Sequence, residues 1–346
     1  MTIWVGRKLM HKLLFLLIFF QSLLGLAASG LMQTAAAQGG TAAVQSQAWP
    51  TRPLRLVVPF NAGLTDTFGR VFAQFLGERL GQTVIVENRA GGGGVVGANA
   101  VARAPADGYT LLLASTSTWG QTAAEMRRLP YDPERDFTPV AALARGGNVI
   151  VVHPSVKANT LAELMTYARA NPGRLRYCSA GIGSNAHFVG VLLAHRQRVE
   201  LQHVPYKGGG AGVTDLLSGQ IEMCVSGTPT GAPHVRAGAL RALAVTSAAR
   251  TPLMPEVPTM AEAGFADFVY GPLFGLLLPA AAPAAVVARL QRESASLLRE
   301  PAYKRRLVEI GAEETEPLIG EAFGRWMRNE AQRTRETAAL AGMKDE

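Results

Sequence analysis

The segment LRLVVPFNAGLTDTFGRVFAQFLGERL, residues 54–80, decides the fold class of this chain. It opens with a short apolar run that is typical of a buried strand, and Asn61-Ala62-Gly63 follows as a turn. From Thr65 to Leu80, apolar residues recur at helical spacing, which predicts an amphipathic helix. The residues on its apolar face are Phe68, Val71, Phe72, Phe75, Leu76 and Leu80. A strand, a turn and a helix in this order form the repeating unit of an α/β fold.

The same alternation of strand and helix continues along the chain. Strands are expected at residues 83–86, 110–114, 149–153, 175–178, 201–205, 221–225, 240–246 and 273–278. Helices are expected at residues 95–103, 160–170, 185–198, 283–298, 302–310 and 321–340, and one more runs from the glycines at 208–210 to residue 217. We therefore predict two lobes, residues 46–150 with 268–346 and residues 151–267, each a mostly parallel sheet flanked by helices.

The first 37 residues have the pattern of a secretory signal peptide. Arg7, Lys8 and Lys12 precede an apolar core at residues 13–20, and small residues stand before a cut after Ala37. The alternative is a membrane anchor, because the apolar stretch is nearly long enough to span a bilayer. The small-residue cleavage pattern favours removal, and with no cysteine near the cut a lipid anchor is not expected. We expect a periplasmic protein.

The charge of the chain argues against nucleic acid as a partner. The formal net charge is +8, and removal of residues 1–37 takes away three positive charges and leaves +5. The remaining Lys and Arg residues are scattered, and residues 127–128 and 304–306 are their only short clusters. A mild positive field suits a protein that meets small anions.

The two cysteines leave two interpretations open. Cys178 and Cys224 each lie at the end of a short apolar run, so both can end strands of one sheet. In an oxidising compartment they can form a disulfide, and the alternative is a pair of buried thiols.

Two motifs suggest enzyme chemistry, but the residues around them favour other roles. Residues 92–97 match G-x-G-x-x-G, yet Asp107 follows only ten residues later and no acid stands where a dinucleotide fingerprint needs one. Ser184 and His187 lie in a strand-to-helix turn that lacks the second glycine of a hydrolase elbow. An exported hydrolase that uses Ser184 is the alternative to anion binding at this helix start. We expect no cofactor, and the dispersed histidines predict no metal site.

Several predicted strand ends are rich in small neutral donors. These segments are residues 61–66, 114–118, 183–186 and 226–228. Any one of them could simply cap a helix. Together they favour a ligand cleft between two lobes, because neutral loops at helix starts bind carboxylates without burying an ion pair.

Sequence motifs in order along the chain carry a family resemblance. They are residues 49–60, VENR at 86–89, ADGYTLL at 106–112, LPYDP at 129–133 with Asp136-Phe137, HVPYKG at 203–208, LRALAVT at 240–246 and PEVPTMAEAG at 255–264. In these motifs the chain resembles the periplasmic solute-binding proteins of tripartite tricarboxylate transporters, the Bug family. The resemblance implies a Venus-flytrap fold that closes on a small carboxylate and catalyses no reaction.

The resemblance also implies the ligand contacts and the partners. It places contacts at Asn61, Ala62, Gly63, Leu64, Thr65, Asp66, Gly183, Ser184, Asn185, Ala186 and His187. The polar strand ends add Ser115, Thr116 and Ser226 as expected contacts. The expected partners are membrane transporter subunits or, as the alternative, a membrane sensor, and the protein is expected to be a monomer.

Two departures from the family pattern bear on the ligand. The first loop is one residue shorter than usual and has Leu64 where a small residue is common, and Ser226-Gly227 replaces a common Asp-Asn. We therefore expect a less polar mono- or dicarboxylate, with aromatic acids among the candidates, with Leu64 and Trp119 near it, and not an amino acid.

Overall fold

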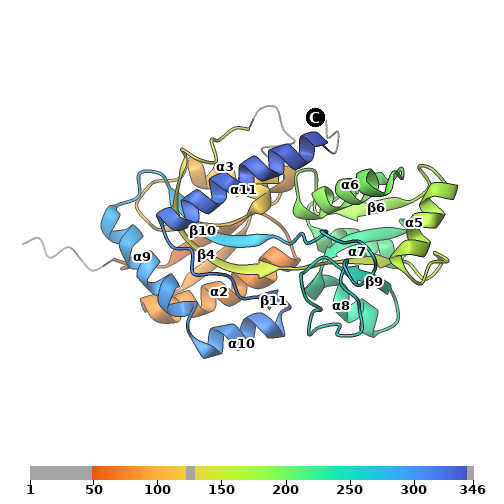
Figure 1. Cartoon of the computed structure of the whole chain (residues 1–346). Coiled ribbons are helices and arrows are strands. Elements are labelled where there is room, and N and C mark those ends of the chain that lie inside the picture. Colours follow the sequence, from red (N-terminus) through yellow and green to blue (C-terminus); the bar gives the residue numbers. More distant parts are fainter. Residues whose placement is uncertain (1–48, 122–128, 341–346) are drawn as a thin grey trace, which may run out of the picture. The chain divides into compact units, whose positions relative to one another are not determined.

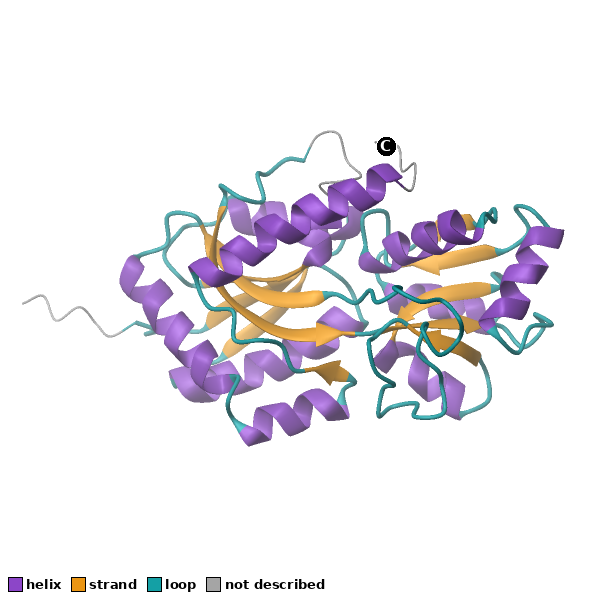
Figure 2. Cartoon of the chain, in the orientation of Figure 1, coloured by secondary structure: helices purple, strands orange, loops and turns teal. Residues whose placement is uncertain are grey.

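The computed structural model describes residues 49–121 and 129–340, so the predicted signal peptide lies outside the described residues. From Pro50 onward the chain forms two β-sheets, each flanked by helices (Figures 1 and 2). Among the described helices, none is both long and apolar enough to cross a bilayer. This is the two-lobe α/β architecture that the alternation of strands and helices predicts.

The first sheet has six strands in the order β11-β4-β10-β3-β1-β2. Its strands are β1 (Leu54–Val58), β2 (Val84–Asn88), β3 (Thr110–Ser115), β4 (Phe137–Gly146), β10 (Leu273–Pro279) and β11 (Ala312–Glu313). The helical segments of this lobe are α2 (Leu64–Leu80), η1 (Gly92–Gly94), α3 (Val95–Ala102), η2 (Ser117–Gln121), α9 (Ala284–Leu297), α10 (Pro301–Glu309) and α11 (Glu321–Leu340). The α2 face matches the prediction, since Phe68, Phe72 and Leu76 are fully buried.

The second sheet has five strands in the order β7-β6-β8-β5-β9. Its strands are β5 (Asn148–Val152), β6 (Arg176–Ser179), β7 (Gln202–Pro205), β8 (Met223–Gly227) and β9 (Arg241–Val245). Its helices are α5 (Leu161–Ala170), α6 (Asn185–Gln197), α7 (Gly209–Leu217) and α8 (Thr228–Arg236). All strands of this sheet come from residues 148–245, whereas the first sheet takes its strands from both sides of that range. β5 thus begins before the predicted lobe boundary after residue 150.

The sheets are mixed, whereas we predicted mostly parallel ones. Within the first sheet, β1 pairs in parallel with β2 and β3, but β10 is antiparallel to both β3 and β4. β5 is likewise antiparallel to β8 and β9 in the second sheet. β5 and β10 are antiparallel to their neighbours because each enters its sheet from the other lobe, and the short strand β11 is also antiparallel to β4.

The two cysteines form a disulfide, which settles the alternatives left open by the sequence. Cys178 of β6 and Cys224 of β8 are direct partners on parallel strands, with Cα atoms 4.6 Å apart. Both side chains are fully buried. The bond ties together two strands whose carboxyl ends lead toward the cavity described below.

Removal of this disulfide is expected to destabilise the second lobe. The double variant Cys178→Ala/Cys224→Ala loses a cross-link over 46 residues of sequence. We expect a loss of about 2–4 kcal/mol in the free energy of unfolding. Chemical denaturation of oxidised wild type, reduced wild type and the double variant measures this loss. Equal stability of the three would contradict it.

Candidate functional site

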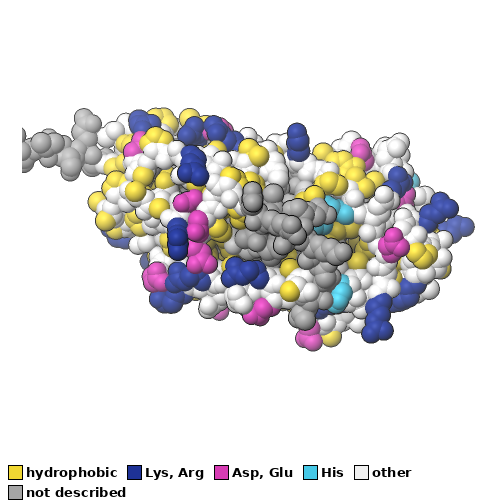
Figure 3. Space-filling model, turned by 90° about the horizontal axis from the view of Figure 1, so that it is seen from above, with side chains coloured by type: hydrophobic (Ala, Val, Ile, Leu, Met, Phe, Trp, Pro, Cys, Tyr) yellow, Lys and Arg dark blue, Asp and Glu magenta, His cyan; other side chains and the backbone are white. Residues whose placement is uncertain are grey.

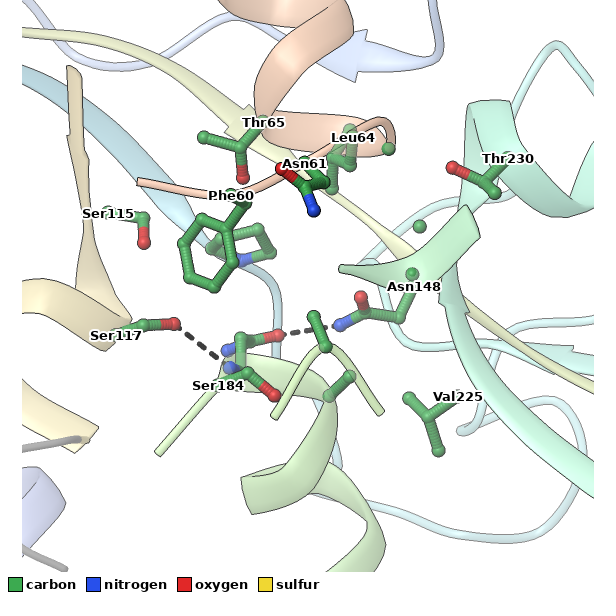
Figure 4. Close-up of a pocket in the computed structure, with 17 residues that line it drawn as sticks. Phe60, Asn61, Leu64, Thr65, Ser115, Ser117, Asn148, Ser184, Val225 and Thr230 are labelled. Atoms are coloured by element: carbon green, nitrogen blue, oxygen red, sulfur yellow. Dashed lines mark hydrogen bonds between the residues drawn. The ribbon is translucent and has the colours of Figure 1, made fainter. Parts of the chain in front are cut away.

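A cavity lies where the two lobes meet (Figure 4). Its volume is about 60 Å³, which is room for more than a single water. It is lined by Phe60, Asn61, Gly63, Leu64, Thr65, Ser115, Ser117, Asn148, Ala180, Ser184, Asn185, Ala186, Gly209, Val225, Gly227, Thr230 and Pro272. None of these described lining residues has an ionisable side chain, so a preference for anions in this cavity rests on backbone N–H groups and neutral polar side chains.

Four helices begin at this cavity. The first turns of α2, α6, α7 and α8 contribute Thr65, Asn185, Gly209 and Thr230 to its lining. The N-caps of α2, α7 and α8 are glycines, and no side chain caps these three helix starts. The first N–H groups of a helix lack intrahelical partners, and the helix dipole places partial positive charge there. The arrangement therefore favours an anion in the cavity although no cationic side chain lines it.

Hydrogen bonds join the two lobes around the cavity. The Asn185 backbone N–H donates to Ser117 Oγ at 2.9 Å, and the Gly210 N–H donates to the Ala62 carbonyl at 3.3 Å. The Asn185 side-chain oxygen also accepts a bond of 2.6 Å from Asn148 Nδ2 (Figure 4). The lobes are thus held together on more than one side of the cavity.

One glycine permits the lobes to approach this closely. A Cβ atom on Gly93 of η1 would lie 2.0 Å from the Ile182 carbonyl oxygen, which belongs to the glycine-rich turn of the second lobe. Gly93 also has a positive φ of 60°, a conformation that side chains disfavour. The glycine stretch that resembles a dinucleotide fingerprint therefore serves as a contact surface between the lobes.

Leu64 lines the cavity, and it also fits between two glycines. A Cβ atom on Gly227 would lie 2.5 Å from the Leu64 Cβ, and one on Gly146 would lie 2.8 Å from its Cδ2. Trp119, which we expected near the ligand, does not line the cavity. It is buried in an aromatic cluster, with ring centroids 5.7 Å from Phe323 and 6.2 Å from Trp326.

The structure brings eight of the predicted contact residues to the cavity. They are Asn61, Gly63, Leu64, Thr65, Ser115, Ser184, Asn185 and Ala186. Six other predicted residues do not line it: Ala62, Asp66, Thr116, Gly183, His187 and Ser226. Neighbouring residues of a loop point in different directions, so the same loop can contribute residues to both groups.

The residues outside the cavity lining have other contacts. Asp66 pairs with Arg70 of the same helix, α2, at 3.0 Å and accepts a hydrogen bond from Asn88. Its carboxylate is therefore held beside α2. Thr116 lines a second cavity of about 550 Å³ beside α11. Ser226 is buried at the end of β8, where its hydroxyl donates to the Gly227 carbonyl at 3.5 Å.

Sequence reasoning missed nine lining residues: Phe60, Ser117, Asn148, Ala180, Gly209, Val225, Gly227, Thr230 and Pro272. Ser117 and Gly227 belong to polar loops that the sequence had marked, so a broader choice within these loops would have included them. Asn148 and Pro272 come from the crossings between lobes, and no local motif marks such positions.

Ser184 caps helix α6 with its side chain. Its Oγ accepts the N–H of His187 at 3.2 Å, which is the usual role of a serine at an N-cap. The Gly183 N–H points toward His187 Nδ1 at 3.4 Å. The hydroxyl of Ser184 is therefore used for capping at the helix start. No group of three His, Cys, Asp or Glu side chains suited to a metal occurs in the described part of the chain.

A pair of stacked histidines lies beside the glycine-rich turn at residues 181–183. The rings of His187 and His203 lie 4.1 Å apart, and His203 Nε2 is 2.7 Å from Ser179 Oγ. Ser179 Oγ in turn accepts the Gly181 N–H at 3.1 Å. Burial, and then the nearby His187 ring, lower the pKa of His203 to about 3. His203 is therefore neutral at physiological pH and available as a fixed support for the turn.

Surface charge shows no concentrated basic patch on the face seen in Figure 3. Among the side chains that the figure colours, Lys and Arg are interspersed with acidic residues.

Comparison with known proteins gives a consistent result. The sequence profile of a family described as "Tripartite tricarboxylate transporter family receptor" matches residues 68–336. Protein BugT of Bordetella pertussis is 36% identical over 300 residues, which cover 84% of this chain and 92% of that protein.

Solved structures resemble the chain as well. The R. palustris protein Rpa4515, solved with adipate, has a TM-score of 0.82 and 35% identity, and the match covers 86% of this chain and 100% of that one. MatC from Rhodopseudomonas palustris, solved with bound malate, has a TM-score of 0.78 and 30% identity, with 84% and 99% covered.

The partly buried His203 is expected to make stability depend on pH. The pKa of His203 lies below its ordinary value of 6.5, so between about pH 3 and 6.5 the unfolded chain binds a proton that the folded chain does not. The stability contribution is therefore present above pH 6.5 and is lost as the pH falls toward 3. Thermal melting at pH 7.5 and 4.5 should show a smaller drop for His203→Gln than for wild type.

The matched control is His195→Gln, which removes an exposed histidine. It is expected to keep the wild-type drop in melting temperature between the two pH values. A His203→Gln variant with an undiminished drop would show that another group causes the dependence.

Proposed function

The chain belongs to the tripartite tricarboxylate transporter receptor family, and we propose that it binds a small organic carboxylate in the cavity between its lobes. The observation that carries this proposal is the convergence of four helix N-termini on a cavity whose described lining has no ionisable side chain. Such a cavity can bind an anion without the desolvation cost of an ion pair. The adipate and malate bound by Rpa4515 and MatC support the same ligand class.

The contacts to the ligand are assigned to the loops of both lobes. We propose that residues 61–65 and Ser115 of the first lobe and residues 184–186 of the second lobe surround it, since all but Ala62 line the cavity. Leu64, Phe60 and Val225 give the cavity an apolar wall, which suits a ligand of low polarity. The described lining has no acid that could pair with an ammonium group, so an amino acid fits less well.

The proposed role is capture and delivery without turnover. Binding between two lobes favours the closed arrangement, because a ligand shifts an equilibrium toward the state that it contacts more fully. We propose that the closed protein, in the periplasm, presents its surface to membrane transporter subunits. Ser184 acts in this scheme as a helix cap beside the ligand and not as a nucleophile.

A charge placed in the cavity should abolish anion binding. Asn185→Asp keeps an oxygen that can accept from Asn148 Nδ2 and adds a negative charge to the lining. Like charges about 4 Å apart near a protein surface repel by about 4 kcal/mol, so we expect at least a tenfold rise in the Kd of the best ligand at pH 7. Thermal shift against mono-, di- and tricarboxylates finds that ligand, and calorimetry measures its Kd.

The control is Asn159→Asp, which adds the same charge at an exposed position of the second lobe. It is expected to keep the wild-type Kd. The proposal fails if wild-type protein freed of co-purified ligand binds no member of the panel, or if the two variants weaken binding equally.

The close approach of the lobes gives a second test. Gly93→Ala places a methyl group against the Ile182 carbonyl and should prevent full closure, which raises the Kd at least about tenfold. Gly238→Ala is the matched control, since Gly238 has a similar φ of 70° but no atom within 4 Å of its added Cβ. Both variants should lose similar stability, and only Gly93→Ala should lose affinity. Unchanged affinity in Gly93→Ala would show that this contact does not accompany binding.

A further inference from the structure

Two short backbone segments carry the chain between the sheets, and glycines form their centres. Gly146-Gly147 connects β4 to β5, and Gly271-Pro272 leads into β10. The segments touch each other, because a Cβ atom on Gly271 would lie 2.0 Å from the Gly146 carbonyl oxygen. Side chains are therefore excluded at this contact, and the glycines there have a wider range of backbone angles than other residues.

Hydrogen bonds tie the two segments together on each side of these glycines. Toward the first sheet, the Gly146 N–H donates to the Pro272 carbonyl at 2.7 Å. Toward the second sheet, Thr246 lies between Asn148 and Tyr270 and bonds to both through its backbone. Its N–H donates to the Asn148 carbonyl at 2.9 Å, and its carbonyl accepts the Tyr270 N–H at 2.9 Å.

The side chain of Thr246 repeats both connections. Its Oγ1 accepts the Asn148 N–H at 3.1 Å and donates to the Tyr270 carbonyl. The residue is fully buried, so these bonds do not compete with bulk water. The Thr246 hydroxyl thus fixes Asn148, which follows the crossing at Gly146-Gly147, relative to Tyr270, which precedes the crossing at Gly271-Pro272.

The same network reaches the cavity. Asn148 lines the cavity, and its Nδ2 donates to Asn185 Oδ1 at 2.6 Å. The Asn185 N–H donates to Ser117 Oγ of the first lobe at 2.9 Å. An unbroken series of hydrogen bonds therefore runs from Tyr270 through Thr246, Asn148 and Asn185 to Ser117.

We propose that Thr246 is a positioning residue for lobe closure. Because Thr246 joins the two crossings, it confines the rotation of the lobes to the glycines that lie between the hydrogen-bonded positions. It also orients Asn148, so that Asn185 contacts Ser117 only when the lobes close. This inference rests on the proposed function, since it assigns Thr246 to the closure of the same cavity. Thr246 does not line the cavity, so its effect on a ligand must act through this network.

The test compares Thr246→Val, which removes only the hydroxyl, with Thr246→Ser, which keeps it. Spin labels on the exposed positions Val96→Cys and Lys207→Cys, one in each lobe, report the distance between lobes without any ligand. We expect Thr246→Val to broaden this distance distribution toward longer values and to raise the Kd about five- to tenfold. Thr246→Ser should restore both values.

Thr259→Val is the stability control, because Thr259 is a buried threonine of the second lobe whose hydroxyl accepts the Glu262 N–H. It should lower the melting temperature and leave the distance distribution unchanged. The inference is overturned if Thr246→Val shows the wild-type distribution, or if Thr246→Ser behaves like Thr246→Val. A wild-type protein that binds no carboxylate would refute the proposed function alone, since the ligand-free distances still test Thr246.

Discussion

The placement of four helix starts around one cavity is the constraint on which the rest of this structure depends. Each start brings N–H groups without intrahelical partners, and such groups cannot be buried together unless something accepts their hydrogen bonds. The protein meets part of this need, because the Gly210 N–H donates to the Ala62 carbonyl and the Asn185 N–H donates to Ser117 Oγ. Water or an anion can accept from the N–H groups that remain. The glycine N-caps of α2, α7 and α8 leave this need unmet by side chains. The lobes, their crossings and their contact surfaces serve to bring these helix starts together.

Glycine has three distinct uses in this arrangement. Gly93 lets backbone meet backbone between the lobes, and Gly227 and Gly146 make room for Leu64. Gly271 and Gly146 allow the two crossing segments to touch. In each case the missing side chain sets the distance between two parts of the chain, which explains why the glycine-rich stretches of this protein need no nucleotide to account for them.

The sequence predicted local structure well and long-range structure only in part. The helix from Thr65 onward has a clear apolar period, and α2 begins one residue earlier than predicted. β4 was missed because Ala141, Ala142 and Ala144 give no strand signal, and the strand forms through its pairing with β10 and β11. In the cavity, Leu64 and Asn185 could be predicted because they lie in marked loops. Asn148 could not, because its position depends on the pairing of β5 with strands far away in the sequence.

The disulfide between β6 and β8 affects the entropy of binding. β6 leads into the turn that contains Ser184, and β8 leads into the start of α8, so the bond fixes the relative position of two of the loops that line the cavity. Loops that are ordered before a ligand arrives lose less conformational freedom when it binds. In the proposed binding role, the second lobe therefore offers a preorganised half-site, and the ordering that remains for the ligand to bring about is the approach of the first lobe.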